Sequence, residues 1–375
     1  AATNWKRSTA MAVPEQPALR TAIAVLLMSA MAFACPAAVA APDDQHAIIL
    51  LYHHVSESTP SSTSVSPAVF ESHLDYLEEN NFRVLPLADI ASALKDKRPL
   101  PPRAVAITFD DGYKSILTEA MPRIAKRGWP FTVFVSTDAI DEGYASFMSW
   151  PDLRRITAGG GTIANHTTSH DHLVRRRPGE SPAAWRQRVT ADIESAQAKL
   201  ESELDNPLRL FAWPYGEFDK DLEELAGKLG LVAFGQQSGP AGHASSLQSL
   251  PRFPMATGFA DLDGFAEKLR TRPLPVAVLS PASRVLRVPA GPPELTIRIP
   301  DGPYRLAALR CYVGGQEPAE VNRRGDVFTV QARKPLRPGR GKFNCTAPSS
   351  EKNGVFYWYS HLWLQPVDDG AWYDE

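Results

Sequence analysis

Short apolar runs alternate with helical patterns over the first two thirds of the chain. Residues 47–52 and 104–109 are nearly continuous apolar runs, which are typical of strands buried on both faces. Residues 67–80 instead carry apolar side chains at helical spacing. The same two patterns predict further strands at 131–135, 162–164, 208–212 and 232–234, and helices at 115–127, 150–156, 183–204 and 219–229. These repeated units predict an α/β fold, with a parallel sheet or barrel covered by helices.

The pattern changes near residue 277. Beyond it the chain has Pro-rich breaks and short alternating runs at 294–299, 304–312, 327–332 and 355–364, with no long helical pattern. Such runs are typical of a small all-β sandwich. A length of 375 residues also favours two domains. We therefore expect a barrel at residues 42–276 and a β-rich accessory domain at residues 277–375.

Residues 1–41 have the pattern of a targeting segment. Arg20 precedes an apolar run at residues 22–34, and an Ala-Val-Ala sequence follows at residues 38–40. A basic flank, a short apolar core and a small-residue end are the signature of a secretory signal peptide. The alternative is an uncleaved membrane anchor, although the run is short for a transmembrane span. We expect cleavage, a periplasmic or extracellular location and no transmembrane span in the mature chain.

Cysteine content and charge narrow the classes of protein further. Without the signal region, Cys311 and Cys345 remain, and such a pair in an oxidising compartment predicts a disulfide. Two buried thiols are the alternative, because a bridge requires proximity. The net charge of -2 argues against a nucleic-acid partner, which would require a basic surface.

Two adjacent carboxylates, Asp110 and Asp111, lie in a Thr-Phe-Asp-Asp-Gly sequence directly after the predicted strand 104–109. Barrel and open-sheet enzymes place catalytic groups at the carboxyl ends of their strands. Side chains of neighbouring residues diverge, so one carboxylate can bind a metal while the other accepts a proton. The alternative is an ordinary acidic turn that leads into a helix.

His166 and His170 follow the predicted strand 162–164. If this stretch is helical, the spacing places both imidazoles on one face, where they can reach one ion. With an aspartate they supply a His-His-Asp ligand set with open positions, which is typical of a catalytic metal site. The alternative is a polar loop with surface histidines.

Two further stretches follow predicted strands. Residues 213–216, Trp-Pro-Tyr-Gly, predict a rigid loop that can present a backbone N–H to an oxyanion, although alone they indicate only a turn. His53 stands at the end of strand 47–52, where a histidine beside a metal site is a candidate general acid. The neighbouring His54 should point the other way in an extended chain.

In this order and at these separations, the Thr-Phe-Asp-Asp-Gly, His-Thr-x-x-His and Trp-Pro-Tyr-Gly motifs resemble the NodB-homology polysaccharide deacetylases, carbohydrate esterase family four. The resemblance runs from residue 47 to about residue 275. An early Tyr-His-His-Val makes the chain more similar to the poly-N-acetylglucosamine deacetylases of biofilm export systems. The resemblance implies a distorted (β/α) barrel, an acetylated polysaccharide substrate and one divalent metal ion, with zinc expected before cobalt or nickel.

The resemblance also implies a role for each motif residue. Asp110 would be the catalytic base, His53 the general acid and the backbone N–H of Tyr215 a donor to the oxyanion. The metal ligands would be Asp111, His166 and His170, and the substrate-binding residues Trp213, Pro214 and Arg252. The implied reaction is metal-assisted hydrolysis that releases acetate.

Two departures from the family pattern affect these roles. Ala212 stands where many members have an arginine that partners the base. Residues 278–280 lack the histidine of the late Leu-x-His motif. We expect His53 to supply the missing histidine and Arg252 to replace the missing arginine.

Three functions remain open on sequence alone. The first is removal of N-acetyl groups from an N-acetylhexosamine polysaccharide, with exopolysaccharide export machinery as a partner class. The second is an O-acetyl esterase with the same metal site, and the third is a non-catalytic sugar-binding protein on the same barrel. Aromatic residues of the accessory region either stack on sugar rings or fill the core, about half in each case: Phe356, Tyr357, Trp358, Tyr359, Trp363 and Trp372.

Overall fold

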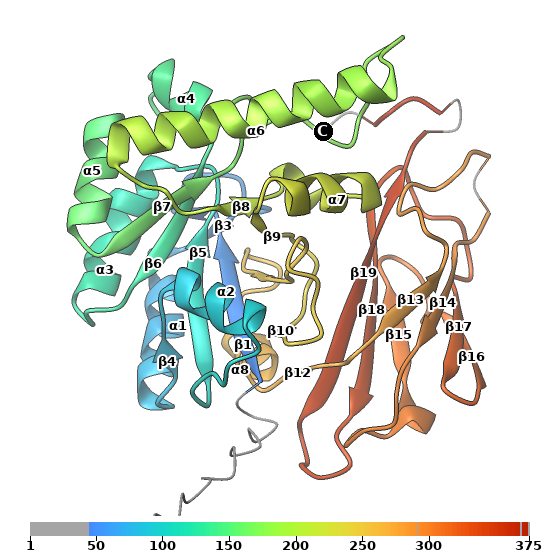
Figure 1. The fold of residues 1–375 in the computed structure, drawn as a ribbon. Coiled ribbons are helices and arrows are strands. Elements are labelled where there is room, and N and C mark those ends of the chain that lie inside the picture. The colour runs from blue at the N-terminus through green and yellow to red at the C-terminus, as the bar shows by residue number, and fades with distance from the viewer. Residues whose placement is uncertain (1–44, 290, 368–369, 374–375) are drawn as a thin grey trace, which may run out of the picture. The chain divides into compact units, whose positions relative to one another are not determined.

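A curled parallel sheet forms the centre of the first part of the chain (Figure 1). The computed structural model describes residues 45–289, 291–367 and 370–373. All side chains of two central strands are buried, as their apolar runs predicted. In spatial order the parallel strands are β1 (His46–Tyr52), β5 (Ala104–Phe109), β6 (Phe131–Val135), β7 (Gly161–Asn165), β8 (Leu210–Ala212) and β9 (Val232–Phe234).

The segment at residues 250–254 joins the two edges of this sheet. Leu250 pairs in parallel with Phe234 at the end of β9. Strand β11 (Phe253–Pro254) then pairs in parallel with β1. The sheet therefore curls into a barrel that is closed only by the short segment 250–254. This agrees with the predicted distorted (β/α) barrel. Two short strands, β4 (Arg83–Val84) and β10 (Ala241–Gly242), extend this sheet, and β2 (His54–Val55) and β3 (Ser64–Val65) pair with each other in a separate two-stranded sheet.

Helices follow most of the strands. The predicted ranges agree to within two residues for α1 (Pro67–Glu79), α5 (Trp150–Ala158), α6 (Pro182–Leu204) and α7 (Lys220–Lys228). The predicted helix 115–127 is instead one turn of π-helix, Ile116–Ala120, followed by α3 (Met121–Ala125). Pro122 explains the break, because it has no backbone N–H to continue the first turn. The pattern missed α2 (Leu87–Lys95), α4 (Thr137–Asp141) and α8 (Leu262–Leu269).

The C-terminal part contains two four-stranded sheets, as the short alternating runs suggested. One has the order β12 (Arg272–Pro273), β19 (Phe356–Gln365), β18 (Gly339–Pro348) and β15 (Arg310–Val313). The other has the order β13 (Ala277–Ser280), β14 (Glu294–Arg298), β17 (Val327–Gln331) and β16 (Glu320–Arg324). The run at 304–312 is only partly a strand, because Leu306–Ala308 form a 3₁₀ turn. All described residues belong to one compact unit, Ala40–Glu375, so the boundary at residue 277 stays a prediction.

The predicted disulfide is present. Cys311 on β15 and Cys345 on β18 lie directly opposite each other in the antiparallel pair and are bonded. Because they are bonded, the alternative of two buried thiols is wrong. Of the six aromatic residues predicted to divide between core and surface, only Phe356 is largely exposed.

None of the helices in the described ranges is long and apolar enough to cross a membrane. The predicted signal region at residues 1–41, with its apolar run, lies outside the described residues.

Candidate active site

The predicted motifs follow the carboxyl ends of the parallel strands. Asp110 and Asp111 come directly after β5, His166 comes directly after β7, and residues 213–216 follow β8. Strand ends on one rim of a barrel converge on one pocket. Asp111 has a left-handed backbone with φ 71°, which turns its carboxylate away from the direction taken by Asp110.

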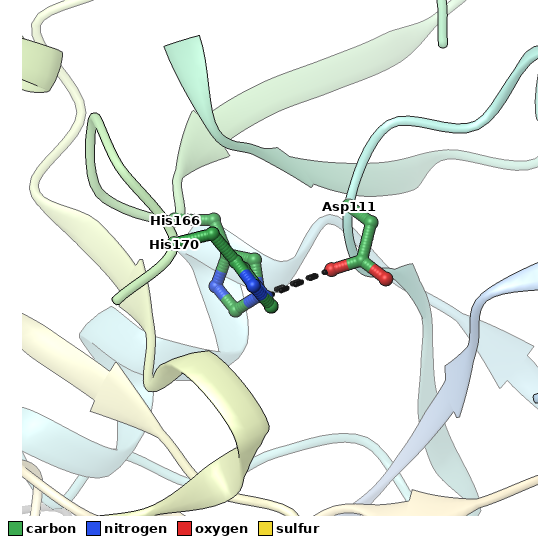
Figure 2. A group of neighbouring side chains, drawn as sticks. All are labelled: Asp111, His166 and His170. Atoms are coloured by element: carbon green, nitrogen blue, oxygen red, sulfur yellow. Dashed lines mark ion pairs between the residues drawn. The ribbon is translucent and has the colours of Figure 1, made fainter. Parts of the chain in front are cut away.

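Asp111, His166 and His170 point their side chains toward one another (Figure 2). Oδ1 of Asp111 lies 3.4 Å from Nε2 of His166 and 3.2 Å from Nε2 of His170. One ligand atom from each residue lies within 4.8 Å of the other two. A single ion can therefore reach all three side chains and keep open positions for water and substrate.

The donor set fits a divalent metal ion. Nδ1 of His166 lies 2.8 Å from the carbonyl oxygen of Ala212, which can only accept, so Nδ1 carries the proton. Nε2 is then left with a lone pair, and this buried atom has no hydrogen-bond partner among the described residues. It faces a carboxylate oxygen of Asp111 at 3.4 Å, and a metal ion between them would satisfy both atoms. An orienting bond from the other ring nitrogen is usual for histidines that bind metals.

The electrostatics of the site also favour an added positive charge. Burial alone would lower the pKa of His166, but the neighbouring Asp111 and Asp110 raise it above its ordinary value. Burial alone would raise the pKa of Asp111, but its contacts with the two histidines and the charge of His53 hold it well below its usual range. Asp111 is therefore ionised at neutral pH, as a metal ligand must be.

The stretch from His166 to His170 is a loop, so the helical form considered for it is wrong. Thr167 and His170 have left-handed backbones, with φ 72° and 57°. Oδ1 of Asn165 accepts the backbone N–H of Thr167 at 2.8 Å, and Oγ1 of Thr167 accepts that of His170 at 2.9 Å. Such side-chain bonds compete with helical ones. The loop reverses the chain and still brings both imidazoles together.

Asp192 on α6 holds this loop, and sequence reasoning missed it. Its Oδ1 accepts the backbone N–H groups of Thr168 and Ser169, both at 3.0 Å. Its Oδ2 accepts the hydroxyl of Ser169 at 2.9 Å. These bonds fix the segment between the two histidines and so preset the spacing of the ligands. A polar residue on an amphipathic helix carries no local signal for such a contact.

Asp110 and Arg252 form a fully buried, bidentate ion pair. Nη1 and Nη2 of Arg252 each donate to one carboxylate oxygen of Asp110 at 2.7 Å. Nε donates to the carbonyl of Gly235 at 2.9 Å, and the guanidinium lies over the ring of Phe134. The closing segment 250–254 thus sets Arg252 against Asp110, as expected of a replacement for the missing arginine. Its burial argues against a direct contact with substrate.

Replacing Arg252 by methionine is expected to lower the free energy of unfolding by about 3–5 kcal/mol, because the carboxylate of Asp110 would stay buried without its partner. Urea denaturation at pH 7 measures this cost. The double variant Arg252→Met, Asp110→Asn removes both charges and is expected to be more stable than Arg252→Met alone. Equal stability of the two variants would show that the pair has no such coupling.

Residues 213–216 form the predicted rigid loop. Tyr215 has a left-handed backbone with φ 59°, and its ring centroid lies 4.6 Å from that of His170. Trp213 and Pro214 are buried, and the indole N–H of Trp213 donates to the carbonyl of Gln248 at 2.8 Å. Their burial argues against the predicted contact with substrate. Trp213 instead anchors the loop to the barrel.

His53 and His54 have different surroundings, as the alternation predicted. His53 is partly exposed, and it lies close enough to Asp111 for its charge to act on that carboxylate. His54 is buried, and its ring stacks on Tyr113 with centroids 3.6 Å apart. Burial and then the charge of His53 lower the pKa of His54. His53 is therefore the better placed of the two to exchange a proton with a bound molecule.

A cavity of about 300 Å³ opens beside two of the candidate ligands, Asp111 and His170. Its wall is partly aromatic and includes Tyr113, Tyr144 and Phe147. A hollow with aromatic walls and a few polar groups is the usual form of a small-molecule site. The candidate metal centre thus borders a space in which a sugar ring can be placed.

The family model, a curated relative and two solved structures that are similar to this chain are all deacetylases or structures related to them. Residues 97–234 match the family model described as polysaccharide deacetylase. The poly-β-1,6-N-acetyl-D-glucosamine N-deacetylase of Escherichia coli K12 is 26% identical over 261 residues. That match covers 60% of this chain and 38% of the Escherichia coli protein, so the chain spans less than half the length of this relative.

Two solved structures share the fold. The deacetylase PplD of Streptococcus pyogenes in complex with acetate is similar with a TM-score of 0.54 and 21% identity, over 60% of this chain and 99% of that one. IcaB from Ammonifex degensii is similar with a TM-score of 0.51 and 23% identity, over 60% of this chain and 96% of that one.

Proposed function

We propose that the chain, whose residues 97–234 match the polysaccharide deacetylase family model, removes N-acetyl groups from an N-acetylhexosamine polysaccharide and releases acetate. The observation that carries the proposal is the ligand set of Asp111, His166 and His170 beside the buried Asp110. The named activity of the Escherichia coli relative supports a polymer of N-acetylglucosamine as the substrate class. An intact ligand set is not expected of a protein that only binds sugars.

The three ligands would hold one divalent ion, zinc before cobalt or nickel, and this ion would supply polarisation of the acetyl carbonyl and activation of water. Asp110 would accept the proton of the attacking water. Arg252 holds that carboxylate in one orientation through two hydrogen bonds. The backbone N–H of Tyr215 would donate to the oxyanion that develops on the acetyl group.

His53 would protonate the departing amine. An amine is a poor leaving group unless it receives a proton, and a histidine has a suitable pKa for this near neutral pH. The position of His53 near Asp111 supports the role, since the late histidine motif is missing. An ester substrate needs this proton less, so a positioned general acid favours amides as the natural substrates.

Export of the mature chain is part of the proposal. The disulfide between Cys311 and Cys345 supports it, because such bonds persist in oxidising compartments. A periplasmic or extracellular location also suits an acetylated polysaccharide as the substrate. Association with exopolysaccharide export machinery stays a prediction.

The test compares amide and ester substrates at matched acetyl concentration. The purified mature chain is expected to release acetate from β-1,6-linked N-acetylglucosamine oligomers faster than from acetylxylan. Asp110→Asn, which removes the proposed base, is the matched control and is expected to release little from either. Acetate from acetylxylan alone would replace the proposal by an O-acetyl esterase. Release from neither substrate, with binding of the oligomer retained, would favour the non-catalytic alternative.

A further inference from the structure

Two basic residues of strand β18 contact the barrel beside the loop that carries Tyr215: Arg340 contacts Tyr215 and Glu217, and Lys342 contacts Gln236. Arg340 and Lys342 belong to the C-terminal β-rich part, and their partners on the barrel lie 123 and 106 residues away in sequence. Residues i and i+2 of a strand point to the same face. The side chains of Arg340 and Lys342 therefore both face the barrel.

The first contact point is Glu217, directly after the Trp-Pro-Tyr-Gly loop. Its carboxylate is fully buried and accepts from Nδ1 of His172 at 2.9 Å. It also accepts from Nη1 of Arg340 at 3.4 Å and from the hydroxyl of Tyr373. A buried carboxylate is stable only when it is paired in this way. Two of its partners come from the C-terminal part of the chain.

The second contact point is the ring of Tyr215 itself. The ring stacks on His172 with centroids 3.8 Å apart and planes within 8°. The guanidinium of Arg340 lies 5.6 Å from the ring centroid. The same tyrosine ring is in contact with the candidate ligand His170. Arg340 therefore contacts Tyr215, the residue that lies next to the candidate metal ligand His170.

The third contact point is Gln236, two residues after β9. Nζ of Lys342 donates to the carbonyl of Gln236 at 2.7 Å. The side chain of Gln236 packs against Gly216, where an added Cβ would come within 2.6 Å of it. Lys342 thus holds the neighbour against which the Tyr215 loop rests.

We propose that Arg340 and Lys342 are positioning residues that fix the Tyr215 loop, so that strand β18 is part of the active site and not a separable accessory. The proposal rests on the proposed deacetylase function, in which the backbone N–H of Tyr215 meets the oxyanion. A donor must keep its position within a fraction of an ångström to act in this way, and a shift of about 1 Å can cost roughly 100-fold in rate.

The experiment compares Arg340→Ala with Arg337→Ala, in the purified mature chain loaded with zinc. Arg337 is an exposed arginine three residues earlier and serves as the matched control. Arg340→Ala is expected to lower kcat on N-acetylglucosamine oligomers by roughly 10- to 100-fold, with KM and metal content nearly unchanged. Hydrogen exchange of the backbone amides at residues 215–217 is expected to become faster. Arg340→Lys, which keeps the charge, should recover part of both effects.

The two readouts separate this proposal from the proposed function. If the parent chain releases no acetate, faster exchange in Arg340→Ala still supports the positioning role, and unchanged exchange overturns it. In an active chain, a loss confined to KM would overturn it, because Arg340 would then bind substrate directly. Equal behaviour of Arg340→Ala and Arg337→Ala would overturn it as well. If Arg340→Ala does not fold, Arg340→Gln keeps the stem and gives the same comparison.

Discussion

Replacing His166 and His170 together by alanine is expected to remove the metal ion and to abolish acetate release. The two histidines supply two of the three ligand atoms, and the remaining carboxylate of Asp111 cannot hold an ion alone. Elemental analysis should find about one ion per chain in the parent protein, as for a mononuclear site, and close to none in the double variant. Each single variant should weaken binding, with the larger loss for His166, which is fully buried and oriented by Ala212.

The control for this experiment is His243→Ala. His243 lies elsewhere on the barrel, with its Nε2 3.1 Å from the carbonyl oxygen of Arg98, and it should retain the full metal content. Thermal unfolding of each variant separates loss of the ion from loss of the fold. Stoichiometric metal in a folded double variant would show that the ion is bound elsewhere and would remove the assignment of the three ligands.

The buried strands are the part of the fold that sequence predicts best. The strands at 104–109, 131–135 and 232–234 have the predicted bounds, because strands buried on both faces have nearly continuous apolar sequences. Strand β18 was missed, although it is ten residues long. It contains two glycines and two basic residues, and its pattern becomes clear only when β15 and β19 pair with it. The burial of β18 therefore depends on its pairing with β15 and β19, which the local sequence does not reveal.

The site residues likewise divide into those that a local sequence pattern predicts and those that depend on long-range contacts. Asp111, His166 and His170 were predicted together because their spacing after two strands is a local signal, although the loop that joins the histidines is not a helix. The pairing of Arg252 with Asp110 was expected only from a resemblance, since 142 residues separate them. The contacts of Asp192 were not predicted at all, because long-range hydrogen bonds leave no pattern in the sequence.

The second prediction with a large expected effect concerns the general acid. His53→Ala is expected to lower turnover of N-acetylglucosamine oligomers by roughly 10²- to 10⁴-fold, the usual contribution of general acid–base catalysis. The metal content should not change, because His53 is not among the ligands. His54→Ala is the matched control at the neighbouring position. Its ring is buried against Tyr113, so its loss should reduce stability more than turnover.

The choice of substrate makes this test specific to proton donation. A phenyl ester of acetic acid carries a leaving group that departs without a proton, so His53→Ala should lose far less activity on it than on the amide. A histidine that only shapes the pocket would lower both activities alike. Near-normal amide turnover in His53→Ala, or loss of its metal, would remove the role. If His53 and His54 share the task, each single variant should show a moderate loss and the double variant a severe one, because residues that act as a unit are not additive.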